Sequence, residues 1–118
     1  MTKIPSGAPA DDSQPPDRAS ASFSVVEHRT GETVVSIAGQ LDISNLPDLA
    51  DRVAAALAKS PTRMVVDVGG VSFADSSAIS LWLQWSMAVP DFELRDPPVL
   101  LRAVITTMGL GEQLGMGQ

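Results

Sequence analysis

Residues 64–78 have the sequence MVVDVGGVSFADSSA, and this stretch decides the fold. Its beginning is apolar without alternation, which is typical of a parallel strand that is covered on both faces. Its end changes character, because Asp75, Ser76 and Ser77 are residue types that favour the cap or the first turn of a helix. The stretch therefore predicts a buried strand that runs directly into a helix, as in α/β proteins.

The chain on either side continues the alternation of strands and helices. Two short β-branched runs come first and are joined by RTGE, in which Gly31 can take the positive φ of a tight hairpin turn. The expected strands are 22–28, 33–39, 63–73 and 92–95, and the expected helices are 44–60, 74–89 and 99–110. This order predicts one small α/β domain, in which an N-terminal hairpin and parallel strands form a mixed β-sheet with helices packed against it.

The expected helices carry apolar residues at helical spacing. Ser44 and Asn45 are cap-type residues ahead of the first helix, and Pro47 lies in its first turn. Its apolar stripe comprises Leu46, Leu49, Ala50, Val53 and Leu57. The last helix is entered through DPP and aligns Leu101, Val104, Ile105 and Met108 before Gly109 as its C-cap. Trp82 and Trp85 in the middle helix suit either the core or a surface for a partner.

Length, charge and composition exclude several classes of function. The chain has 118 residues, so it can hold one domain with one core. Its net charge of -6 argues against nucleic acid as a partner, because phosphate backbones are bound by clustered Lys and Arg. With no Cys and one His, the sequence offers no disulfide framework, no thiolate nucleophile and no zinc knuckle.

The N-terminal residues differ in composition from the rest. Residues 1–21 are rich in proline and nearly free of large apolar side chains, so we expect a disordered tail ahead of a domain at 22–118. They lack the apolar run of a signal peptide, which favours the cytoplasm. The longest mostly apolar stretch, 78–89, is shorter than the roughly 20 residues that a bilayer requires, and it is interpreted as a buried helix without membrane insertion.

Polar residues gather where two of the expected strands end. The turn at Asp75 and Ser76 offers hydroxyls and backbone amides that could hold an anion, or Asp75 could simply cap the helix. Asp42 ends the GQLD run, and the predicted sheet places it near Asp75. Two carboxylates could form an acid/base pair or a Mg²⁺ site, but no third ligand or activating group accompanies them. With His28 expected on a distant surface, the sequence predicts no catalytic residue, no metal and no cofactor.

Four pieces of the sequence carry a resemblance to a known family. They are GQLD at 39–42, MVVDV at 64–68, VSFADSSA at 71–78 and VITTMGL at 104–110. Their order and spacing resemble those of STAS domains, and in particular of the bacterial anti-sigma-factor antagonists, over about residues 22–114. The DSS element after the buried strand is the most specific piece. The resemblance implies a small α/β domain that binds a protein partner and is not an enzyme.

The resemblance also implies a mechanism. Members of that family bind an anti-sigma factor, usually a serine kinase, and so free a sigma factor for transcription. Phosphorylation breaks the complex, and a phosphatase opposes the kinase. The modified hydroxyl is the first Ser or Thr after the Asp of the motif, which corresponds to Ser76, with Ser77 as the fallback acceptor. The implied docking face comprises Asp42, Ser44, Asn45, Asp75, Ser76, Ser77 and Ala78.

One departure and one alternative accompany this interpretation. Ala78 stands where the family pattern usually has Gly, and we expect its Cβ at the helix start, where a partner or a kinase would approach closely. The alternative is a STAS accessory subunit of a membrane transport system for lipids or anions, with an exposed Trp82 and Trp85 pair as the contact. A hydrolase that uses Ser76 lacks a base. The sequence leaves the oligomeric state open.

Overall fold

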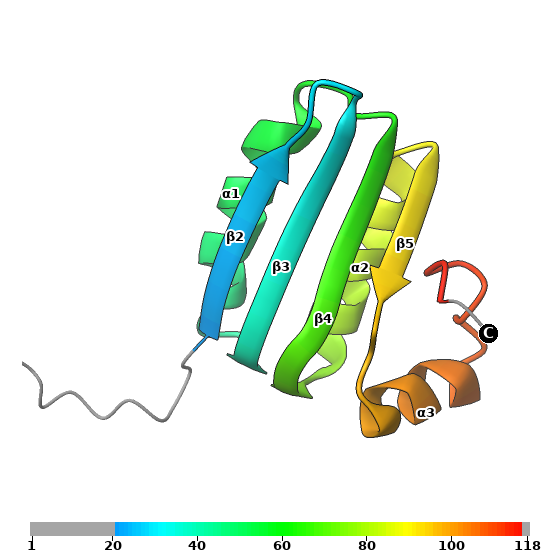
Figure 1. Cartoon of the computed structure of the whole chain (residues 1–118). Coiled ribbons are helices and arrows are strands. Elements are labelled where there is room, and N and C mark those ends of the chain that lie inside the picture. Colours follow the sequence, from blue (N-terminus) through cyan, green and yellow to red (C-terminus); the bar gives the residue numbers. More distant parts are fainter. Residues whose placement is uncertain (1–20, 117–118) are drawn as a thin grey trace, which may run out of the picture.

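The computed structural model describes residues 21–116 as an alternation of strands and helices (Figure 1). The elements are β2 (Ala21–Glu27), β3 (Glu32–Leu41), α1 (Leu46–Leu57), β4 (Arg63–Ala74), α2 (Ser76–Ala88), β5 (Asp91–Arg95) and α3 (Val99–Thr107). The tail expected at the N-terminus lies outside the described residues, except that Ala21 is the first residue of β2.

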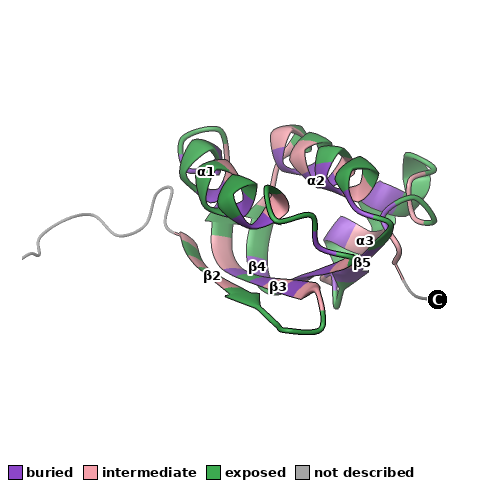
Figure 2. Ribbon diagram, turned by 90° about the horizontal axis from the view of Figure 1, so that it is seen from above, coloured by how far each residue is buried: buried purple, intermediate pink, exposed green. Residues whose placement is uncertain are grey.

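The sheet has four strands in the order β2-β3-β4-β5. β2 pairs with β3 in antiparallel fashion, whereas β3, β4 and β5 are parallel neighbours. The hairpin turn contains Gly31 at a φ of 94°, in the left-handed region that its sequence predicted. Figure 2 shows α1 and α2 on the same face of the sheet, and Figure 1 shows α3 beyond the carboxyl ends of the parallel strands. The predicted mixed α/β domain is therefore confirmed.

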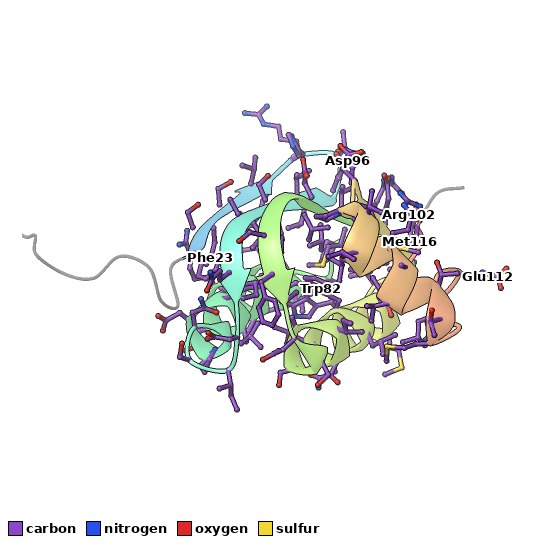
Figure 3. The ribbon with its side chains drawn as sticks, turned by 90° about the horizontal axis from the view of Figure 1, so that it is seen from below. Phe23, Trp82, Asp96, Arg102, Glu112 and Met116 are labelled. Atoms are coloured by element: carbon purple, nitrogen blue, oxygen red, sulfur yellow. The ribbon has the colours of Figure 1, made fainter. Side chains whose placement is uncertain are left out.

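The hydrophobic core lies between the sheet and these two helices. Met64 and Val66 are fully buried in this core, and Val65, which alternates to the other face of β4, is fully buried as well, as the unbroken apolar run predicted. Trp82 (Figure 3) and Trp85, both residues of α2, are buried in the core, which settles the question that the sequence left open. Of the predicted stripe of α1, Leu46, Leu49 and Val53 are buried and Ala50 and Leu57 are half-buried, while Ala56 is buried in addition. In α3 the expectation is partly wrong: Leu101 and Ile105 are buried, but Val104 and Met108 are about half exposed.

The amino ends of the parallel strands carry a cluster of charges. Arg63 at the start of β4 pairs with Glu32 at 3.2 Å and Asp91 at 2.6 Å, and it also contacts Glu93. The pKa of Glu93 is lowered, mainly by its hydrogen bond from Arg95 and then by Arg63. A lowered carboxyl pKa contributes stability at neutral pH that is lost as the pH falls through the folded-state value. The cluster therefore stabilises the edge of the sheet where the parallel strands begin, which is opposite to the edge where β3 and β4 end.

The segment after α3 packs against the outer edge of β5. The backbone N–H of Leu94 donates to the carbonyl of Leu114 at 3.0 Å, and the Leu114 side chain is fully buried. Gly115 has a φ of 64°, and a Cβ at this position would lie 2.0 Å from the carbonyl oxygen of Phe92. This close approach covers the edge of β5, which would otherwise offer unpaired backbone groups.

Replacing Gly115 with alanine should lower the free energy of unfolding by about 2 to 4 kcal/mol, because strain from the left-handed conformation and a backbone clash act together. Gly109 is a matched control, since it has a φ of 75° but no atom within 4 Å of an added Cβ. Gly109→Ala should cost only about 1 kcal/mol. Urea unfolding of both variants measures the difference, and equal losses would contradict the tight contact with β5.

Candidate functional site

The ends of β3 and β4 lie side by side and place the predicted residues together. The parallel register aligns Gln40 with Phe73 and Leu41 with Ala74. Asp42 and Asp75 therefore each begin the connection from a neighbouring strand into a helix, as the sequence predicted. Both connections lie at the lower edge of the sheet in Figure 1, which is also the edge that α3 approaches.

Asp75 is the N-cap of α2. Its backbone is extended, and its Oδ1 atom accepts hydrogen bonds from the amide of Ser77 at 3.0 Å and the amide of Ala78 at 3.3 Å. Of the two interpretations that the sequence allowed, capping is the one that the geometry shows. Because Asp75 already occupies these two amides, they are not available to an external anion.

Ser76 and Ser77 differ in their surroundings, although they are adjacent. Ser76 is exposed, and within residues 21–116 its hydroxyl has no hydrogen-bond partner. Ser77 is half-buried and lines a shallow groove of about 350 Å³ between α1 and α2. A modifying enzyme could therefore reach the hydroxyl of Ser76 without displacing any contact of the domain.

The connection from β3 to α1 is held by its own side chains. Oδ1 of Asp42 accepts hydrogen bonds from the backbone N–H of Ser44 at 2.9 Å and from its hydroxyl at 2.5 Å. Asn45 is only 9% exposed; its Oδ1 accepts from the amide of Asp42 at 3.1 Å, and its Nδ2 donates to the carbonyl of Gln40 at 2.8 Å. The loop is thus tied to the end of β3.

The prediction that Ser44 or Asn45 caps α1 is wrong. Asn45 occupies the N-cap position, but its side chain makes no capping hydrogen bond to the helix. Ser44 turns its hydroxyl to Asp42 instead of the first turn. Pro47 lies at the start of α1 and has no amide that would need a partner, so the helix begins with less demand for a cap.

Ile43 is a site residue that the sequence did not single out. It lies on the loop between β3 and α1, is 74% exposed, and lines the same groove as Ser77. Exposed large apolar side chains beside polar groups are typical of protein-binding surfaces. Ile43 lies three residues before Leu46 and seven before Ala50, so it has the spacing of the apolar stripe of the following helix, and its sequence pattern does not reveal its exposure.

Ala78, which was expected at the docking face, is buried, and so are Trp82 and Trp85, which only the transport-subunit alternative placed at the surface. Ala78 has no exposed area, so its Cβ lies in the core and the expected approach of a partner to it is wrong. It contributes to the site by shaping the start of α2. Trp82 and Trp85 are buried as well, and the transport-subunit alternative therefore loses the contact that it invoked.

The described residues hold no cluster of metal-ligating side chains at this edge. Between residues 21 and 116, no three His, Asp or Glu side chains gather as a metal ion would require. His28 is exposed, as expected, and lies after β2 at the other end of the sheet. No helix within this part of the chain has the length and apolar character to cross a membrane.

Replacing Asp75 with alanine should lower the free energy of unfolding by about 1 kcal/mol, because two amides at the start of α2 lose their acceptor. Ser76→Ala is the control on the next residue and should change stability by less than about 0.5 kcal/mol, since that hydroxyl is exposed and unbonded. Thermal and urea unfolding provide the measurement. An Asp75→Ala variant as stable as the wild type would contradict the capping role.

Solved structures of other proteins share this fold. A solved anti-sigma factor antagonist from Mycobacterium paratuberculosis superposes with a TM-score of 0.75 at 25% sequence identity, covering 83% of this chain and 86% of that chain. The unphosphorylated form of the anti-sigma factor antagonist SpoIIAA gives a TM-score of 0.70 at 20% identity, over 82% of this chain and 89% of that chain.

A third solved structure and a family model also match the chain. The Bacillus cell fate determinant SpoIIAA in its phosphorylated form gives a TM-score of 0.66 at 20% identity, covering 82% of this chain and 92% of that chain. No curated protein shows a significant sequence match. The family model described as "Mlab, STAS domain" matches residues 24–116, which is nearly the whole described domain. The chain therefore belongs to the STAS-domain family.

Proposed function

We propose that this protein is an anti-sigma-factor antagonist of the cytoplasm. It binds an anti-sigma factor that is also a serine kinase, and thereby frees a sigma factor for transcription. The observation that carries the proposal is Ser76, an exposed and unbonded hydroxyl at the start of α2, directly beside the capping carboxylate of Asp75. The likeness to the Mycobacterium paratuberculosis antagonist, at 25% identity, supports the same role.

The docking face is the edge where β3 and β4 end. Asp42, Ser44 and Ser77 supply polar groups, and Ile43 supplies an exposed apolar side chain beside them. Asn45 and Ala78 support this face from beneath, because both are buried. Apolar side chains surrounded by fixed polar groups fit a protein partner better than a small substrate.

Phosphorylation of Ser76 is the switch that ends the complex. A phosphoryl group adds about -1.5 to -2 charges and three acceptor oxygens. It would arise next to the Asp75 carboxylate, and the two amides that Asp75 already occupies cannot neutralise it. Unpaired charge in the contact area disfavours docking. A loss of about 3 kcal/mol in binding already weakens a complex more than a hundredfold.

The kinase, the phosphatase and the nucleotide belong to the partners. The antagonist presents the hydroxyl, and the anti-sigma factor supplies ATP and Mg²⁺ for the transfer of the γ-phosphoryl group to Ser76. An opposing phosphatase hydrolyses the phosphoserine and restores the hydroxyl. No group of the antagonist takes part in either step beyond positioning the acceptor at the start of α2.

Intact-mass spectrometry tests the site. Incubation with ATP, Mg²⁺ and the anti-sigma kinases of the host should add one phosphoryl group to the wild type and to Ser77→Ala, but none to Ser76→Ala. The half-buried position of Ser77 is the physical reason for this selectivity. Modification that survives in Ser76→Ala and disappears in Ser77→Ala would move the site to the fallback acceptor.

The same variants test the partner. Immobilised wild type and Ser76→Ala should retain the anti-sigma factor from host extract, whereas Ser76→Asp should retain at least about tenfold less, because its carboxylate mimics part of the added charge. Recovery of a membrane ATPase instead, with equal binding by all three proteins, would contradict the proposal and favour the transport-subunit alternative.

A further inference from the structure

An apolar groove lies between the end of β4 and α3. Its volume is about 490 Å³, and it is lined mainly by Phe73, Pro98, Val99, Leu100, Leu101 and Val104. Phe73 is 55% exposed, Val99 82% and Leu100 81%. Figures 1 and 3 agree that α3 lies beside the end of β4, so strand and helix form the two walls of the groove.

The exposed side of α3 is an apolar ridge beside this groove. Leu100, Val104 and Met108 follow one another at a spacing of four residues, which places them on the same face of the helix. Leu101 and Ile105 form the buried face, which packs into the core. The helix is therefore apolar on two faces, although the domain covers only one of them.

The exposed apolar area has the size of an interface core. The ridge together with Phe73 and Val99 exposes on the order of 500 Å², near the upper end of what single-chain proteins leave uncovered. A stable protein interface buries about 800 Å² on each partner, and its centre is apolar. This patch can supply that centre, with polar side chains around it as the rim.

We propose that a second copy of this chain covers the groove, so that the protein forms a two-fold symmetric dimer through α3. A two-fold interface requires a patch that complements itself. Here ridge and groove lie in one patch, and each copy can place its Leu100 and Val104 in the groove of the other. The inference does not rest on the proposed function.

Charge supports a second copy as the occupant. Each chain carries a net charge of -6, so two copies repel each other over most of their surfaces. The residues that line the groove, and Met108, are all uncharged, which makes this face one where two copies can meet without opposing carboxylates. The N-terminal residues 1–20 are a poorer match, because they hold three Asp and only Met1 and Ile4 as large apolar side chains.

Sedimentation equilibrium of the full chain between about 5 µM and about 500 µM tests the proposal, since association of copies depends on concentration. The wild type should approach the mass of two 12.4 kDa chains. Leu100→Glu should remain a monomer. The dissociation constant of its dimer should be at least about 100-fold higher than that of the wild type, because the substitution buries an unpaired charge on each copy. Circular dichroism checks that the variant folds.

Met87→Glu is the matched control. Met87 is 72% exposed on α2 and does not line the groove, so this variant should dimerise as the wild type does. A monomeric wild type over the whole range would overturn the proposal, and so would equal dissociation of both variants. Nuclear Overhauser contacts between Ile4 and Leu100 within a monomer would assign the groove to the N-terminal residues instead.

Discussion

Because β3 pairs with β4 in parallel, with Leu41 opposite Ala74, both strands leave the sheet at the same edge and at the same height. This pairing is the constraint on which the candidate site depends. It brings two loops that are far apart in sequence, one starting at Asp42 and the other at Asp75, onto one surface. A sheet in which these strands were antiparallel would place the two loops at opposite ends.

The capping of α2 gives this edge its chemical character. Asp75 holds the start of the helix and occupies the amides that would otherwise attract an anion. Ser76 is left exposed beside a fixed carboxylate. The unmodified hydroxyl is small and neutral, whereas a phosphoryl group there would meet negative charge without a compensating donor. Under the proposed function, phosphorylation of Ser76 would therefore weaken docking without a rearrangement of the fold.

Much of the fold could be predicted, because it follows from local patterns. Three local patterns predict their elements directly. The unbroken apolar run that starts at Met64 predicts a buried strand, the DSS segment after it predicts the start of a helix, and the glycine between the first two strands predicts a tight hairpin turn. The strand ends then define where Asp42 and Asp75 lie. The same reasoning could not tell a buried tryptophan from an exposed one, since both occur on helices of this composition.

The structure differs from the sequence prediction at residues whose burial or bonding depends on the tertiary fold. Val104 and Met108 have the helical spacing of core residues, yet α3 lies beyond the strand ends and buries only its Leu101 side. Asn45 has the residue type of a cap, but it bonds to the end of β3, which local sequence does not reveal. Ile43 has the helical spacing of the α1 stripe, yet it lies before the helix begins and is exposed at the site, which the periodic pattern does not reveal.

Hydrogen exchange with and without the anti-sigma factor tests the central claim most directly, namely that the partner docks where β3 and β4 end. The account predicts slower amide exchange in the complex at residues 42–46 and in the first turn of α2. It predicts little change in the β2–β3 turn or at the start of β4. Protection at that opposite end of the sheet, with none around Ser76, would contradict it.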